Sequence, residues 1–463
     1  MHNHKHNPRH NHNQSESEQT AIEQGLEKIL SPFQQFIKNQ TTSSLVLILA
    51  TVVALVIANS GLASHYHAWQ HLPLGIVVGD WSLVMGSKHW INDGLMTIFF
   101  FLLGLEIKRE MLVGEIKQVQ VLVPVMAAAL GGMLVPAGIY YGFNAGTAYV
   151  QGWGIPMATD TAFAIGVLAF LGRRIPATAF TFLVALAIID DLGAILVIAL
   201  FYSDSINLLN LWVGAGLLLL LILLNVIGVR NPWVYLGVGT LLWGAMLGSG
   251  IHATVAGILI AATVPARPKR KPGWFLQRVT ELVSKFERLE RRKDGPGPML
   301  AEAEQHAVLE SMQAAAEKAT TPLRRWERVL EYPVALLVLP IFAFANAGIE
   351  LHLDALQESQ INSVALGVVL GLVLGKGVGI PLFTWVALRL GLGQLPAGLQ
   401  MSHVVGLGLL GGIGFTMSMF ISSMGFEEMP AALNTAKLGI LVASLLAGLA
   451  GYFWLRRCGQ KLA

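Results

Sequence analysis

Residues 177–202 read ATAFTFLVALAIIDDLGAILVIALFY, and the only charged members of this run are the adjacent aspartates Asp190 and Asp191. The run is long enough to cross a bilayer, because a transmembrane helix needs about 20 predominantly apolar residues. Charged side chains at that depth cost about 2.5–3.5 kcal/mol each on insertion scales and usually have a function. The structural alternative is a pair of protonated hydrogen-bonding groups, but leucine would pack better there.

The composition of the 463-residue chain indicates a membrane protein with many spans. Hydrophobic residues make up 54% of the chain and charged residues 13%, whereas charged residues average about 25% in soluble proteins. A mean hydropathy of +0.60 over this length cannot come from one anchor helix. The net charge of +3 gives no indication of nucleic-acid binding. The single cysteine, Cys458, excludes an internal disulfide and a cysteine-built metal site.

Outward from residues 177–202, the sequence predicts an all-α, polytopic fold with about twelve transmembrane helices. Several of the apolar stretches are shorter than the 18 or so residues that identify a span from length alone. The twelve stretches are Leu45–Asn59, Leu95–Ile107, Val121–Phe143, Gly154–Leu171, Ala177–Tyr202, Leu208–Val229, Val234–Leu247, Ile251–Val264, Val334–Ile349, Val364–Leu388, Val404–Phe426 and Leu438–Leu455.

The distribution of basic residues supports this number of spans. With the N-terminus in the cytoplasm, the loops richest in Lys and Arg all fall on the cytoplasmic side, as the positive-inside rule requires, and Lys88 lies on the other side. One long helix over Val234–Val264 is the alternative to the seventh and eighth stretches. It would place the 14 Lys and Arg of residues 265–329 outside, so two short spans are the preferred interpretation.

These spans divide the chain into five parts. Residues 1–40 form a polar tail with a His-rich beginning, which we interpret as a solvated low-complexity segment rather than a metal site. Residues 41–264 contain the first eight helices, and residues 330–457 contain the last four. Residues 265–329 are predicted to form a cytoplasmic loop with one or two surface helices. Residues 458–463 form a cytoplasmic C-terminus.

Two of the predicted helices contain sequences that should interrupt them. Thr159 and Asp160 lie in GIPMATDTAFAIG (154–166), and the eleventh stretch contains GLGLLGGIGF (406–415). Paired breaks of this kind are typical of inverted-repeat transporters, whose broken helices cross near the midplane and form an ion site there. Alternatively, these glycines do not interrupt the helices and only allow them to pack closely. The presence of Asp160 beside one break favours transport.

Lys376 is the lone cation near the middle of the tenth stretch. A buried ammonium group pairs with a carboxylate or gives up its proton, and Asp190 or Asp191 is the natural partner. Carboxylate, hydroxyl and backbone carbonyl oxygens suit small hard cations such as Na⁺ and Li⁺, and carboxylates also bind protons. Competition between cation and proton at an alternately exposed site is sufficient for coupled exchange. If Lys376 also releases its proton when a cation binds, two protons move per cation and the exchange is electrogenic.

Three further ionisable residues lie within or beside predicted spans. Asp93 and Glu106 flank the second stretch, about 20 Å apart along a helix. Glu106 is either functional or an ordinary boundary charge at the cytoplasmic edge. His252 lies near the outer end of the eighth stretch, where a hydrogen-bonded polar histidine is the simpler interpretation.

Seven stretches then show a family resemblance. They are WINDGLMTIFFFLLGLEIKRE (90–110), ATDTAFAIGVLAFLG (158–172), LVALAIIDDLGAILVIALFYS (183–203), GIHATVAG (250–257), LPIFAFANAGIEL (339–351), GKGVGI (375–380) and GGIGFTMSMFI (411–421). Together they closely resemble the NhaA family of bacterial sodium/proton antiporters, a family of inverted-repeat transporters with broken helices. The likeness covers nearly all of the chain from about Leu45 to Arg457.

The resemblance implies an inner-membrane protein that exports Na⁺ or Li⁺ in exchange for protons and is active at alkaline pH. It implies that Asp190 and Asp191 bind the cation and exchange protons, with Asp191 as the principal ligand. Asp160 and Thr159 would lie where the broken helices cross, and Lys376 would balance their charge. No enzymatic activity and no cofactor are expected, since Na⁺, Li⁺ and H⁺ are substrates. The family also suggests a homodimer, for which residues 61–90 offer a polar, exposed contact.

The resemblance further assigns a cytoplasmic cluster to the pH response. The matching positions are Glu106, Arg109, Glu110 and Glu327, and the position of His252 affects the pH profile. Asp93 would belong to the same set or to an access funnel. The His-rich tail and about 50 residues between Arg267 and Thr320 have no counterpart in compact members of the family. Because pH regulation is expected at the cytoplasmic face, these departures affect the pH midpoint and the regulatory assignment more than the central residues.

Other classes of function fit the sequence less well. A symporter would need polar or aromatic residues near the carboxylates to line a pocket for an organic substrate, and few are present. An intramembrane aspartyl protease needs facing aspartates from two helices, whereas Asp190 and Asp191 diverge by about 100° on one helix. The HExxH signature of a zinc protease is absent. A channel would use rings of groups from several subunits, and this chain has a single set.

Overall fold

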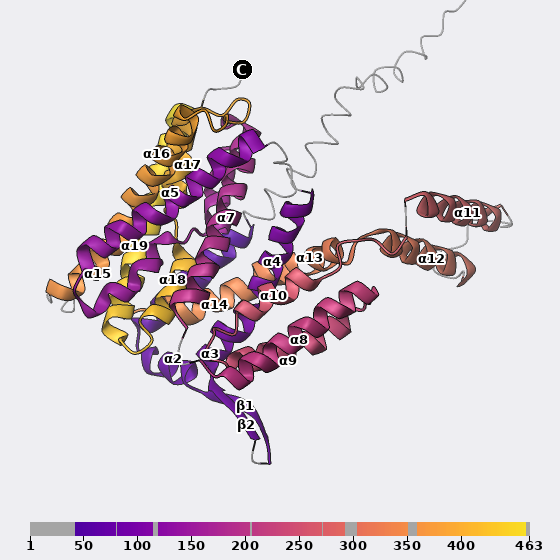
Figure 1. Ribbon diagram of the computed structural model, residues 1–463, viewed down its shortest axis with the longest axis horizontal. Coiled ribbons are helices and arrows are strands. Elements are labelled where there is room, and N and C mark those ends of the chain that lie inside the picture. The colour runs from indigo at the N-terminus through magenta and orange to yellow at the C-terminus, as the bar shows by residue number, and fades with distance from the viewer. Residues whose placement is uncertain are drawn as a thin grey trace, which may run out of the picture.

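A computed structural model describes residues 42–79, 81–113, 119–203, 206–270, 272–291, 303–350 and 359–459. The predicted His-rich tail of residues 1–40 therefore lies outside the described residues. The described chain forms a bundle of long helices, many of them packed obliquely (Figure 1).

The elements follow the apolar stretches of the sequence closely. They are a first helix, Thr42–Ala58, then α2 (Ala63–Gln70), β1 (Pro73–Val78), β2 (Trp81–Gly86), α3 (Ser87–His89), η1 (Trp90–Leu95), α4 (Met96–Val113), α5 (Val119–Asn144), η2 (Ala148–Met157), α6 (Thr161–Phe170), η3 (Gly172–Arg174), α7 (Ala177–Phe201), α8 (Leu208–Ile227), α9 (Pro232–Leu247), α10 (Val255–Thr263), α11 (Pro272–Glu290), α12 (Ala303–Ala319), α13 (Pro322–Pro333), η5 (Val334–Val338), α14 (Leu339–Ala347), α15 (Ser359–Leu370), η7 (Gly371–Gly375), α16 (Lys376–Arg389), α17 (Met401–Gly411), α18 (Phe415–Gly425) and α19 (Pro430–Cys458).

The helices confirm a polytopic membrane protein. Within the described residues, seven helices are long and apolar enough to cross a membrane, or up to ten if each of three bent pairs is one span. The number twelve stays a prediction, because α9 and α10 are shorter than an ordinary span. The structure does separate these two helices, as the preferred interpretation requires. Gly250 lies between them with φ 84°, a conformation that favours glycine.

The predicted helical class is confirmed, with one small exception. Residues 73–86 form an antiparallel hairpin in which Pro73 pairs with Gly86 and Val78 with Trp81. The hairpin projects from the bundle at the end away from the C-terminus (Figure 1). The β-branched run before Gly79 favours a strand, and the φ of 61° at Gly79 suits a two-residue hairpin loop. Both strands are too short and too apolar to be distinguished from a helix by periodicity alone.

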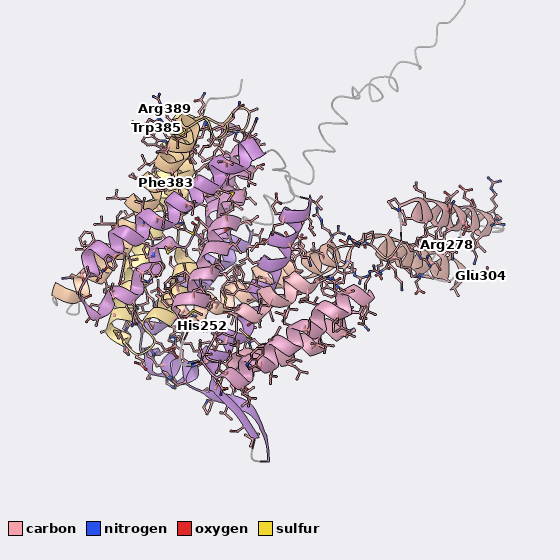
Figure 2. All side chains as sticks on the ribbon, viewed as in Figure 1. His252, Arg278, Glu304, Phe383, Trp385 and Arg389 are labelled. Atoms are coloured by element: carbon pink, nitrogen blue, oxygen red, sulfur yellow. The ribbon has the colours of Figure 1, made fainter. Side chains whose placement is uncertain are left out.

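Helices α11 and α12 form a pair that extends away from the bundle (Figure 1). Arg278 and Glu304 mark this pair in Figure 2. Leu282 and Val308 are buried between the two helices, and the amide of Gln305 donates to Glu290 Oε2 at 2.8 Å. The surface helices predicted in the 265–329 segment are therefore present, while residues 292–302, with the Gly-Pro-Gly-Pro sequence, lie outside the described part.

Helices α5 and α16 cross in close contact near the functional residues. Gly131 of α5 and Gly379 of α16 face each other so closely that a methyl group on either would collide with the backbone carbonyl oxygen of the other. Small residues permit this approach in membranes, where dispersion contacts between helices replace the hydrophobic effect. The contact fixes α16, and with it Lys376, against the centre of the bundle.

We expect Gly131→Ala to destabilise the protein by about 1–3 kcal/mol, the usual cost of overpacking. Gly138→Ala on the same helix is the matched control, because an added Cβ there meets nothing within 4 Å and alanine favours a helix by up to about 1 kcal/mol. Thermal unfolding of both variants in detergent measures the difference. Equal unfolding temperatures would show that the crossing is not tight.

Candidate ion-binding site

Helix α7 holds Asp190 and Asp191 in the interior of the bundle. It packs against α5, η2, α6 and α17, and its two aspartates are 0% and 4% exposed. Since neighbouring helix residues diverge by about 100°, the two carboxylates point to different surroundings. Both are therefore taken out of bulk solvent and depend on nearby groups for compensation.

Asp190 forms a buried ion pair with Lys376. The Lys376 ammonium donates to Asp190 Oδ2 at 2.6 Å and to Thr159 Oγ1 at 2.9 Å, and the lysine is completely buried. Lys376 begins α16 directly after the π-helical turn η7, a local distortion that is common at functional sites. Of the two partners that the sequence allowed for Lys376, the structure selects Asp190.

The two predicted breaks are present, and they contact each other. The η2–α6 pair bends by 42° and the α17–α18 pair by 47°. At the breaks, the backbone N–H of Asp160 donates to the carbonyl of Ile413 at 2.6 Å. Thr159 Oγ1 lies 2.9 Å from both Asp190 Oδ2 and the carbonyl of Gly411. Thr159 therefore connects the broken backbone to the buried ion pair.

The Asp160 carboxylate lies at the N-termini of two half-helices. Oδ1 accepts from the backbone N–H of Phe163 in α6 at 3.1 Å. Oδ2 accepts from the backbone N–H of Thr416 in α18 at 3.0 Å and from its hydroxyl. Helix N-termini carry free N–H donors and partial positive charge, so a carboxylate at this place is stabilised by both breaks at once.

Thr416 is a functional candidate that the sequence analysis missed. It lies within the quoted 411–421 stretch, two residues after Gly414, and it is 2% exposed. A hydroxyl residue directly after a glycine-broken turn is the only signal for it, because its partner Asp160 is distant in sequence.

Asp191 is the least compensated carboxylate of the site. Its Oδ1 is buried and has no hydrogen-bond partner, and the same holds for Asp190 Oδ1. The charged groups that act on Asp191 include Asp190, Asp160, Lys376 and Glu106, so negative charge predominates around it. Buried oxygens without donors in a negative environment are suited to a cation or a proton.

Some of the predicted pH-response residues lie close together. Arg109 Nε lies 2.9 Å from Glu327 Oε1, which joins α4 to α13. The charged groups that act on Glu106 are Glu327, Arg109 and Glu331. Glu110 makes no ion pair within the part of the chain that the structure describes. The structure therefore forms a cluster around Arg109 and leaves Glu110 beside it.

Asp93 and His252 lie at a separate place. Asp93 is half-buried in η1, and the charges acting on it are His252, His89 and Glu427. The His252 Nε2–H donates to the carbonyl of Tyr202 at 2.6 Å; Figure 2 labels this histidine. The hydrogen bond agrees with the interpretation of His252 as a satisfied polar residue, and the structure does not bring it to Asp190 or Asp191.

The charge analysis of the loops also missed Lys437. It directly precedes the twelfth predicted stretch, yet it is only 3% exposed in α19. Its amine is within hydrogen-bonding reach of Lys88, the basic residue predicted on the same side. Tertiary packing brings together two lysines that are far apart in sequence.

The sequence of this chain is similar to those of known antiporters. The model of the Na+/H+ antiporter 1 family matches residues 34–455. A relative from Saccharophagus degradans named Na(+)/H(+) antiporter NhaA 1 is 45% identical over 95% of this chain and 94% of its own length. One of the same name from Shewanella denitrificans is 46% identical over 96% and 98%.

A solved structure is more distantly similar. It is the sodium proton antiporter MjNhaP1 from Methanocaldococcus jannaschii at pH 8, with a TM-score of 0.48, 14% identity and coverage of 94% of this chain and 99% of that one. The family assignment depends on the sequence comparisons instead. Because the family model and these relatives extend over nearly the whole chain, the protein belongs to the NhaA family of Na⁺/H⁺ antiporters.

Proposed function

We propose that this protein exports Na⁺ or Li⁺ across a bacterial inner membrane in exchange for protons, by alternating exposure of one buried site. The observation that carries the proposal is Asp191, which has an unpartnered buried oxygen next to the Asp190–Lys376 ion pair at the contact of two broken helices. Such a protein would maintain sodium and pH homeostasis at alkaline pH.

Competition for the Asp191 oxygens would couple the two ions. A carboxylate that holds a proton cannot also bind Na⁺ with the same oxygens, so a high proton concentration releases the cation and a low one favours its binding. The hydroxyl of Thr159 and the carbonyl of Gly411 lie at the same break and are oxygen donors of the kind that hard cations prefer. One site that serves both ions in turn is sufficient for exchange.

The Asp190–Lys376 pair supports an electrogenic exchange. When a cation is attracted to the carboxylates, the Coulomb attraction that keeps Lys376 protonated is shared with a competing charge. Release of the lysine proton in addition to that of Asp191 would move two protons per cation. The exchange would then carry net charge and respond to the membrane potential.

The fold proposal has twelve spans with inverted-topology repeats and both termini in the cytoplasm. Helices α9 and α10, as two short spans, would keep the basic 265–329 segment on the cytoplasmic side, in agreement with the positive-inside rule. We also propose a homodimer in contact with lipid. The β1–β2 hairpin offers an exposed contact there, although its exposed side chains Leu74, Val77 and Val84 (45–65% exposed) are apolar and not polar as predicted.

We further propose that the cluster of Arg109, Glu106 and Glu327 sets the pH response. Glu106 acts electrostatically on Asp191 along α4 and α7, and the Arg109–Glu327 pair connects α4 to α13. Protonation of these carboxylates at low pH would break the link between the two helices. Glu110, His252 and Asp93 complete the proposed regulatory set without direct contact with the ion site.

Asp191→Asn is expected to abolish exchange, because an amide cannot supply the negative charge that binds the cation. Dequenching of a pH-sensitive dye in acid-loaded everted vesicles, on addition of NaCl, LiCl or KCl between about pH 6.5 and 9, measures this. Glu428→Gln, an exposed carboxylate, is the matched control and should transport normally. If none of these salts dissipates the proton gradient in well-expressed wild type, the result would instead indicate a symporter of another solute.

Removal of one member of the buried pair should cost about 3–5 kcal/mol, because the other charge is left buried alone. We therefore expect Lys376→Gln to lower the unfolding temperature in detergent strongly, and the double variant Asp190→Asn, Lys376→Gln to recover most of it. The same double variant should exchange without responding to an imposed potassium diffusion potential. A double variant as unstable as Lys376→Gln alone would argue against the pair.

Arg109→Gln is expected to move the alkaline activation of exchange toward higher pH. Without the guanidinium, the nearby carboxylates lose the positive charge that favours their ionised, active state. The midpoint of dye dequenching against pH measures the shift, and Arg278→Gln on α11, whose pair with Glu281 is exposed, should leave it unchanged. An unaltered midpoint in Arg109→Gln would remove this cluster from the pH response.

A further inference from the structure

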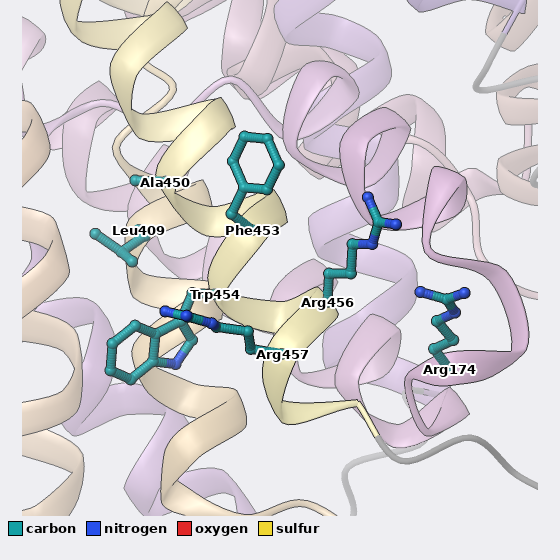
Figure 3. A pocket seen from close by; sticks show the side chains of 7 residues that line it. All are labelled: Arg174, Leu409, Ala450, Phe453, Trp454, Arg456 and Arg457. Atoms are coloured by element: carbon teal, nitrogen blue, oxygen red, sulfur yellow. The ribbon is translucent and has the colours of Figure 1, made fainter.

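A hollow of about 670 Å³ lies where the C-terminal end of α19 meets the turn after α6. Arg456 and Arg457 line it from α19, and Arg174 lines it from η3, the short turn between α6 and α7. Figure 3 shows Arg456 and Arg174 on one side of the end of α19, whereas Arg457 extends to the other side, toward Trp454. Three arginines from two distant parts of the sequence therefore line one hollow, and two of them, Arg174 and Arg456, lie on the same side of it.

No carboxylate of the described residues neutralises these arginines. None of the three makes an ion pair within the described part of the chain, and all three are exposed. Arginine presents a planar fork of donors that matches the oxygens of a phosphate. The arrangement is therefore complementary to an anion with several oxygens.

The other walls of the hollow are apolar. Phe453 and Trp454 are 56% and 43% exposed, and Leu409 and Ala450 complete this side. The Trp454 ring is fixed, because its Nε1–H donates to the carbonyl of Ser402 at 2.9 Å. An occupant would thus have an anionic end at the arginines and a hydrocarbon part along α19 and α17.

The backbone holds the arginines in place. A Cβ added to Gly459 would lie 2.8 Å from the carbonyl oxygen of Arg174, so the end of α19 packs directly on the turn that carries this residue. Basic residues in the last turn of a helix ordinarily complement its dipole, and the positive-inside rule accounts for their number. Neither effect requires Arg174 to meet Arg456 and Arg457 around one hollow.

We propose that this hollow binds the headgroup of an anionic phospholipid of the surrounding membrane, with the phosphate between Arg174 and Arg456, Arg457 adding positive charge from the other side, and an acyl chain against Phe453. Basic pockets at the cytoplasmic ends of transmembrane helices are typical sites for such lipids. A free phosphate would satisfy the arginines but would leave the apolar wall unused. The bound lipid would join α19 to the turn that follows α6, the half-helix that Asp160 caps.

The test compares the full chain in detergent with added dioleoylphosphatidylglycerol, dioleoylphosphatidylcholine or inorganic phosphate. Native mass spectrometry counts retained lipid, and thermal unfolding follows stabilisation. We expect wild type to retain phosphatidylglycerol and gain stability from it, and to respond to neither of the other two. Arg174→Gln and the double variant Arg456→Gln, Arg457→Gln should each lose about tenfold in apparent affinity for phosphatidylglycerol, the order of one charge-assisted contact.

Arg389→Gln is the matched control. Arg389 ends α16 beside Trp385, as Figure 2 shows, but it does not line the hollow, so its substitution should leave lipid retention unchanged. Because the substituted arginines are exposed, monodisperse protein is expected, and Arg174→Lys, which keeps the charge but loses the planar fork, should give an intermediate affinity. Equal retention by all variants, or equal binding of the two lipids, would overturn the proposal. Stabilisation by inorganic phosphate alone would identify a free-anion site instead.

Discussion

The burial of the Asp190–Lys376 ion pair constrains the rest of this structure. Two opposite charges at 2.6 Å and without solvent exposure are tolerated only where geometry and additional hydrogen bonds compensate for lost hydration. Thr159 supplies one of those bonds, and it can do so only because the helix is broken at this point. The break, the threonine and the ion pair are thus parts of one arrangement.

The second break follows from the same requirement. A backbone that leaves helical geometry inside a membrane must have its polar groups satisfied by protein. Asp160 and Ile413 satisfy each other through the backbone, and the Asp160 carboxylate accepts from the start of both half-helices. Each broken helix therefore stabilises the other, while Asp191 is left beside them with an uncompensated oxygen. A site that is complete except at one carboxylate is well suited to exchange one small cation for a proton.

Three features outside this centre differ from it in their packing and charge. The glycine contact between α5 and α16 positions Lys376, and the Arg109–Glu327 pair joins α4 to α13. The arginine-lined hollow lies at the end of α19, against the turn after α6. The charges at the centre are buried, and Asp190 is paired with Lys376, whereas the arginines at the hollow are exposed and make no ion pair within the described residues. This contrast distinguishes the proposed ion site from the proposed lipid site.

The sequence alone determined the polytopic helical class, the two breaks and the central residues, because a charge or a glycine cluster in a long apolar run has few explanations other than function. Only the tertiary structure decided that Lys376 pairs with Asp190, that Thr416 holds Asp160, and that Lys437 meets Lys88, since these contacts join residues far apart in sequence. The hairpin at residues 73–86 was missed because a short apolar run has the same pattern in a strand and in a buried helix. Periodicity determines which face is apolar, and packing determines which residues meet.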